Sequence, residues 1–173
     1  MTSTSTDTGL AFRVSRRVAV PAAEVWREMQ RPGHLTECHP FCQRNEPERW
    51  PGVGSRDAVH YYNGKVIHRN FLTWEEGRGY LVYVTDERER RVLDAEFLVA
   101  PAPGDPRASI MTIRGSGVPS RILPDRVRRV MWQVAERALI ERYFDAVIQG
   151  FEFHLTTGKT VGRSQFGWLP LFS

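Results

Sequence analysis

Apolar and polar residues alternate over several stretches of this chain, and near the C-terminus the spacing of the apolar residues becomes helical. Residues 12–20 alternate in this way, which predicts a strand with one buried face. Two short helices are expected next, one beginning at Pro21 and ending before Pro32, and a further helical turn over residues 34–40.

The middle of the chain is predicted to be an antiparallel meander. Residues 55–62 and 65–74 flank Asn63-Gly64, the dipeptide favoured in a two-residue type I′ hairpin turn. Further strand-like runs follow, separated by a charged turn and a proline-rich breaker, at residues 80–85, 92–100 and 109–114.

From Asp125 the apolar residues fall on one helical stripe, which predicts a long amphipathic helix that ends near Gly158. The expected organisation is therefore a disordered tail at residues 1–10, one domain at 11–158 and an apolar extension at 159–173. Strands followed by one long helix predict an α+β fold, in which a curved antiparallel sheet wraps around the C-terminal helix.

Composition narrows the class of protein. The 173 residues are 41% hydrophobic and 25% charged, which are globular values, and no run approaches the ~20 apolar residues of a membrane span. The net charge of +4 is mild and the arginines are interleaved with acids, so nucleic-acid binding is not expected. We expect a cytoplasmic protein that does not insert into membranes.

Local sequence adds a family resemblance. Residues 18–26 lead from the first strand into the first helix as in the START-like (SRPBCC) helix-grip superfamily. His39-Pro40-Phe41-Cys42, residues 50–57 and Tyr61-Tyr62-Asn63-Gly64 resemble its bacterial members labelled polyketide cyclase/dehydrase. The resemblance implies a deep, mostly apolar pocket for a small hydrophobic or aromatic molecule.

The predicted hairpin indicates which side chains would face that pocket. A two-residue loop pairs Tyr61 with Val66 and Asp57 with Asn70, and the more apolar face is assigned to the cavity. This face carries Asp57, Val59, Tyr61, Val66, His68, Asn70, Leu72 and Trp74. His68, Tyr61 and Asp57 become candidates for proton transfer, against the alternative that they are structural. A bulge that shifts the register would instead turn His60, Tyr62 and Arg69 inward, where Arg69 could pair with an acidic ligand group.

Other candidate ligand contacts come from outside the hairpin. On the helical side they are Trp26, Met131 and Phe144, and on the later strands Tyr83 and Phe97. Each of these is also a candidate core residue. His34, Cys38, His39 and Cys42 are close in sequence but lack the spacing of a tetrahedral metal site, so no metal is predicted. The sequence has no GxGxxG, Walker-type or iron–sulfur motif, so no cofactor is predicted either.

Three functions remain open at this point. The first is binding of a small hydrophobic, lipid- or polyketide-like molecule. The second is a polyketide cyclase/dehydrase-type enzyme that uses the pocket histidine, tyrosine and aspartate for proton transfer. The third is a protein-interaction role for the apolar segment of residues 162–173, on a partner or across a homodimer; the alternative is that this segment covers its own domain.

Overall fold

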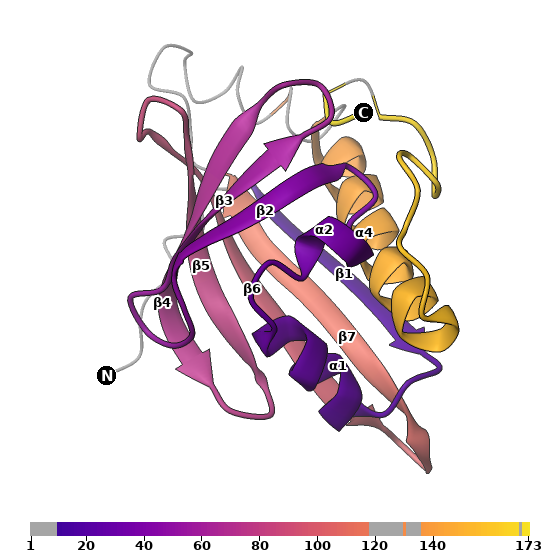
Figure 1. Ribbon diagram of the computed structural model, residues 1–173. Helices are drawn as coiled ribbons and strands as arrows, with labels where there is room; N and C mark the ends of the chain where they lie inside the picture. Colours follow the sequence, from indigo (N-terminus) through magenta and orange to yellow (C-terminus); the bar gives the residue numbers. More distant parts are fainter. Residues whose placement is uncertain (1–9, 118–129, 131–135, 170) are drawn as a thin grey trace.

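The computed structural model describes residues 10–117, 130, 136–169 and 171–173. It contains a curved, antiparallel seven-stranded sheet in the order β1-β7-β6-β5-β4-β3-β2 (Figure 1). The strands are β1 Ala11–Val18, β2 Cys42–Arg49, β3 Arg56–Tyr61, β4 Val66–Glu75, β5 Gly79–Asp86, β6 Arg91–Ala102 and β7 Asp105–Gly117. Two short helices, α1 Ala22–Gln30 and α2 Leu35–Cys38, precede β2, and the long α4 is Arg137–Thr157. These elements confirm the predicted α+β architecture.

The long helix α4 lies alongside β1 and α2, while α1 packs over β6 and β7 (Figure 1). Gly150 explains how α2 can approach α4. A Cβ atom at this position would lie 2.1 Å from the backbone oxygen of Cys38, so any larger residue would force the two helices apart. Gly158 ends α4 in the left-handed conformation, with φ of 69°, as the sequence predicted.

The hairpin between β3 and β4 corrects the predicted register. Its loop has three residues, because the Tyr61 backbone N–H bonds to the Lys65 carbonyl at 2.9 Å. Asp57 therefore pairs with Arg69, and Val59 with Ile67. The prediction of a type I′ turn is wrong for a local reason: that turn needs positive φ at both central residues, and only Gly64 has it, at 86°.

This shift of one residue exchanges the faces of β4 but leaves those of β3 unchanged. Arg69 and Ile67 now join Asp57, Val59 and Tyr61 on the inner face. The prediction that His68, Asn70 and Leu72 face the cavity is therefore wrong. A bulge between Phe71 and Thr73 shifts the alternation again, and Phe71 and Trp74 both pack inward.

The strand β2 was not recognised in the sequence. Most of its side chains are exposed, and it contains Pro47, so it carries no alternating apolar signal. Its position at the edge of the sheet explains both features, since an edge strand tolerates a missing backbone N–H.

Aromatic side chains fill the core beneath α1, and we call them the tryptophan cluster: Trp26, Trp50, Phe71, Trp74 and Tyr80. Ring centroids in this cluster lie 5.0 Å apart for Trp50 and Phe71, and 5.5 Å apart for Trp26 and Trp74. These are ordinary distances for packed aromatic pairs. The rings of the tryptophan cluster therefore fill the core beneath α1.

The described part of the C-terminal extension packs on its own domain. The backbone N–H of Val161 bonds to the Glu37 carbonyl, and that of Ser164 to the Pro40 carbonyl, both at 2.8 Å. Leu169 is buried, and Phe172 packs on Tyr143 with ring centroids 4.3 Å apart.

Of the helices in the described ranges, none is both long enough and apolar enough to span a membrane.

Candidate functional site: an apolar cavity with polar donors

A cavity of about 220 Å³ lies between β3–β6 and the first half of α4. Its lining is mostly aliphatic and aromatic. Strands contribute Val59, Tyr61, Ile67, Arg69, Val84, Val92, Leu93, Ala95 and Phe97; helices contribute Leu35, Ile140, Tyr143, Phe144 and Val147; His39, Lys65 and Phe172 complete it. The inner face of the sheet and the apolar face of α4 are therefore separated by a cavity in this region.

The predicted ligand contacts divide into separate groups in the structure. Those that line the cavity are Val59, Tyr61, Arg69, Phe97 and Phe144. Asp57 lies behind Arg69 and is not part of the lining. Trp26 and Trp74 belong to the tryptophan cluster, since their rings pack against each other with centroids 5.5 Å apart. Met131 lies outside the described residues.

The remaining predicted contacts lie on the outer face of the sheet. Tyr83 pairs with Asn70 across β4 and β5, and Arg91 packs over its ring at 5.0 Å. His68 Nδ1 is 3.9 Å from a carboxylate oxygen of Glu89, on the same outer side. The structure therefore does not bring His68 together with Tyr61 and Asp57, which the sequence had grouped.

Three buried polar side chains form a hydrogen-bonded row along the cavity wall, and we call them the donor chain: His39, Tyr143 and Tyr61. His39 Nε2 lies 2.9 Å from the Tyr143 hydroxyl, which lies 2.6 Å from the Tyr61 hydroxyl. The backbone N–H of Phe41 donates to His39 Nδ1 at 3.2 Å. Since Nδ1 accepts, the neutral ring carries its hydrogen on Nε2 and donates it to Tyr143.

The buried environment keeps the donor chain neutral. Burial, aided by the positive charge of Arg69, lowers the pKa of His39 to about 3. Burial also raises the pKa of both tyrosines, Tyr61 and Tyr143, well above the usual value. Near neutral pH all three groups therefore retain the hydrogens that make them donors.

Arg69 and Asp57 form a buried ion pair at the inner end of the cavity. Arg69 Nε donates to Asp57 Oδ1 at 2.9 Å, and its Nη2 donates to Oδ2. Asn45 Nδ2 donates to the same carboxylate at 2.9 Å. Burial alone would raise the pKa of Asp57, but the charge and hydrogen bonds of Arg69 outweigh it and lower the pKa. The carboxylate is thus an ionised partner of Arg69.

The C-terminal residues lie at the mouth of the cavity. Lys65 and Val92 are exposed residues of the lining, which locates the opening near the β3–β4 turn. The Leu171 carbonyl accepts hydrogen bonds from Asn63 Nδ2 at 2.9 Å and from Lys65 Nζ at 3.3 Å. These contacts hold Phe172 against Tyr143, so the chain partly covers its own cavity.

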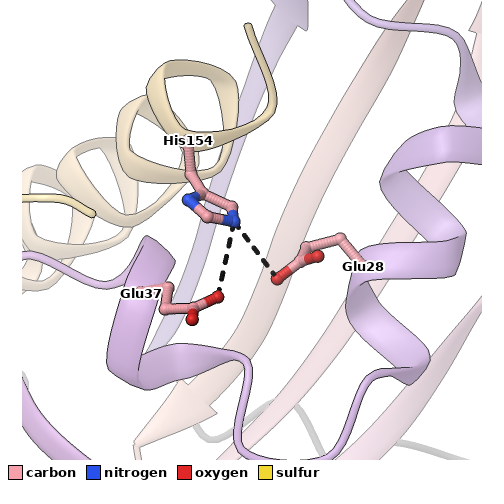
Figure 2. Close-up of side chains that lie close together, drawn as sticks. All are labelled: Glu28, Glu37 and His154. Carbon is pink, nitrogen blue, oxygen red and sulfur yellow. Dashed lines mark ion pairs between the residues drawn. The ribbon is translucent and has the colours of Figure 1, made fainter. Parts of the chain in front are cut away.

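A second polar cluster lies apart from the cavity. Figure 2 shows Glu28 of α1, Glu37 of α2 and His154 of α4, with His154 Nε2 lying 3.8 Å and 3.6 Å from the two carboxylates. Such a group offers ligand atoms for a metal ion. Arg31 Nη2, however, contacts both carboxylates, so a guanidinium already occupies the space between them. The cluster is best described as an ion-pair network that joins three helices.

Several cavity residues were missed in the sequence for identifiable reasons. Tyr143 lies in the predicted helix, but a tyrosine within an apolar stripe gives no separate signal. His39 was considered only with the nearby cysteines, and its partner Tyr143 is 104 residues away. Phe172 belongs to the extension, whose apolar composition indicated docking without showing where.

Comparison with known proteins provides structural similarity only. No protein-family model matches the sequence, and no curated protein is similar enough in sequence to count as a match.

Solved structures with the same arrangement of elements are numerous. DynU16, described as a protein in the dynemicin biosynthetic locus, has a TM-score of 0.66 at 17% identity, covering 87% of this chain and 49% of its own. The present chain thus spans about half the length of DynU16. XoxI from Bacillus cereus has a TM-score of 0.63 at 11% identity, covering 85% of this chain and 96% of its own. Ara h 8.0201 has a TM-score of 0.61 at 14% identity, and the match covers 85% of this chain and 97% of Ara h 8.0201. With the curved sheet and long C-terminal helix, these similarities establish that the chain has the helix-grip fold.

Proposed function

We propose that this protein binds a small hydrophobic or aromatic molecule in the cavity between the sheet and α4. The observation that carries the proposal is the cavity itself, of about 220 Å³ with a mostly apolar lining. An apolar cavity of ~150 Å³ accommodates benzene, so a cavity about half as large again and open at its mouth suits a ligand of two or three fused rings. Apolar walls with few polar groups are typical of small-molecule sites.

The fold similarity to DynU16 supports the same conclusion. That protein is described by its biosynthetic locus, which favours a small organic molecule as ligand over a macromolecule. The resemblance remains one of fold, and it does not identify the ligand of this chain.

A proton-transfer enzyme of the polyketide cyclase type has weaker support. Of the candidate catalytic groups, only Tyr61 lines the cavity. Asp57 is engaged by Arg69, and His68 lies on the outer face. His39 does line the cavity, but its Nδ1 lone pair accepts the Phe41 N–H, so neither ring nitrogen is free to act as a base. Binding requires none of these groups to transfer a proton.

Fluorene is a suitable probe, because it is apolar, polycyclic and small enough for the cavity. We expect saturable binding of fluorene at one site, measured by calorimetric titration. Ala95 lines the cavity, so Ala95→Leu fills part of it and lowers the affinity at least about tenfold.

The matched control is Ala100→Leu, which makes the same substitution on the exposed side of the same strand. This variant should bind fluorene as the wild type does. No binding by the wild type, or unchanged binding by Ala95→Leu, would overturn the proposal. Native mass spectrometry of the purified protein complements the titration, because a co-purifying molecule released on denaturation would identify the natural ligand class.

A further inference from the structure

The donor chain contains more hydrogens than its own hydrogen bonds use. Its donors are His39 Nε2–H, the Tyr143 hydroxyl and the Tyr61 hydroxyl, and its two hydrogen bonds use two of these three hydrogens. His39 cannot accept one in return, because Phe41 N–H occupies Nδ1. One hydroxyl hydrogen therefore remains, whichever tyrosine donates to the other.

That remaining hydrogen has no acceptor in the described part of the chain, and it belongs to Tyr61 or Tyr143, two residues that line the cavity. A buried donor without a partner is unfavourable, so a ligand with an atom that accepts the hydrogen binds more tightly. The donor chain is also held in place. His39 orients the Tyr143 hydroxyl, and the rings of Phe41 and Phe172 pack on the Tyr143 ring. The result is a preorganised donor in an apolar wall.

The other polar groups of the cavity are donors as well. Arg69 and Lys65 complete the polar lining, and among the described lining residues none is aspartate or glutamate. The charge of Arg69 is already balanced by Asp57 at the inner end. An anionic ligand would lose its hydration there without gaining an unpaired cation, whereas a neutral acceptor has a much smaller cost of desolvation.

From this geometry we infer that the cavity selects ligands bearing a neutral acceptor oxygen, an aromatic ketone or quinone carbonyl, which receives the free hydroxyl hydrogen of the Tyr61–Tyr143 pair. This inference rests on the proposed function, because it specifies the ligand class of the same cavity. It also predicts discrimination against ammonium groups, whose hydrogens would face other donors.

The test compares 9-fluorenone with fluorene, which share one ring skeleton and differ by a carbonyl in place of a methylene group. In a cavity without a donor, fluorene should bind at least as tightly as fluorenone, because the fluorenone carbonyl loses its hydrogen bonds to water on entering an apolar site. We expect the wild type to reverse this order and to prefer fluorenone. The double variant Tyr61→Phe/Tyr143→Phe should shift the ratio of the two affinities by about tenfold towards fluorene.

Two further measurements separate a specific hydrogen bond from a change in shape. The carbonyl stretch of bound fluorenone should lie at a lower wavenumber in the wild type than in the double variant, because hydrogen bonding weakens the C=O bond. Tyr83→Phe removes a hydroxyl from the outer face and should leave both the ratio and the stretch at their wild-type values.

The outcomes distinguish the two proposals. If the wild type binds both probes and the ratio is the same in the double variant, the inferred carbonyl site is wrong and the apolar binding function stands. If the wild type binds neither probe, the proposed function itself fails. If the ratio changes without a change in the carbonyl stretch, the tyrosines act through shape, and the inferred hydrogen bond is again wrong.

Discussion

Two regions on the inner face of the same sheet differ in how they are filled. Along β4 the inward residues are Ile67 and Arg69 at the cavity, then Phe71 and Trp74 in the tryptophan cluster. Along β5 the smaller Val84 lies at the cavity and Tyr80 in the cluster. Side-chain size thus increases from one end of these strands to the other. The comparison shows that the volumes of the inward residues, as well as sheet curvature, decide where a hollow remains.

The Arg69–Asp57 ion pair separates the two regions, and breaking it should have the largest effect. Arg69 lines the cavity, while its Nη1 lies 3.5 Å from the Tyr80 hydroxyl and its guanidinium 5.2 Å from the Phe71 ring. Arg69→Leu leaves the Asp57 carboxylate buried without its cation and should lower the free energy of unfolding by about 3–5 kcal/mol.

Urea unfolding measures this change, and the double variant Arg69→Leu/Asp57→Leu is its control. Removing both charges should restore most of the lost stability, because the attraction within a buried ion pair offsets little more than the cost of desolvating its two charges. If the single variant loses less than about 1 kcal/mol, the carboxylate is not isolated from water and the boundary between the regions is more open than described.

Acid titration compares a histidine from each region, with an expected effect of about 3 kcal/mol per histidine between pH 6 and pH 4. His34 packs between Trp50 and Phe151, and His39 lines the cavity. Burial, with the nearby charge of Arg69, lowers the pKa of both from 6.5 to about 3. Below pH ~6.5 the unfolded chain therefore takes up protons that the folded protein does not. Stability should fall with decreasing pH down to about 3, by about 1.4 kcal/mol per pH unit for each histidine.

The variants His34→Gln and His39→Gln sharpen this comparison. Each should remove about 1.4 kcal/mol per pH unit from the slope of unfolding free energy between pH 6 and pH 4, measured by urea unfolding at several pH values. Equal changes indicate that the cavity wall is as dry as the cluster. A much smaller change for His39→Gln would contradict the lowered pKa of His39 and indicate water in the cavity.

Two phenylalanines of similar burial give the smallest expected difference. Phe71 lies in the tryptophan cluster at 2% exposure, and Phe97 borders the cavity at 6%. Phe71→Ala should cost about 3–5 kcal/mol of unfolding free energy, and Phe97→Ala about 1 kcal/mol less. The reason is that part of the Phe97 surface faces empty space and has fewer packing contacts to lose. Equal costs would mean that the cavity is closed in solution.

Local sequence patterns predicted the elements better than the site. Alternation identified β1 and β3–β7, and helical spacing with Gly158 located the end of α4. The strand β2 carries no such alternation. The inner face of β3 was predicted from alternation and from the more apolar composition of that face, and it is correct for Val59 and Tyr61. The face of β4 depended in addition on the turn, and the three-residue loop moved Arg69 inward in place of His68.

The sequence by itself determined the order of strands and helices except β2, the antiparallel meander and the apolar stripe of the last helix. These follow from periodicity, which relates residues a few positions apart and needs no knowledge of distant neighbours. Only the tertiary structure decided the hairpin register, the buried partner of Asp57 and the meeting of His39, Tyr143 and Tyr61. His39 and Tyr143 are 104 residues apart, and their hydrogen bond exists because packing of α4 against α2 brings two otherwise unrelated segments together.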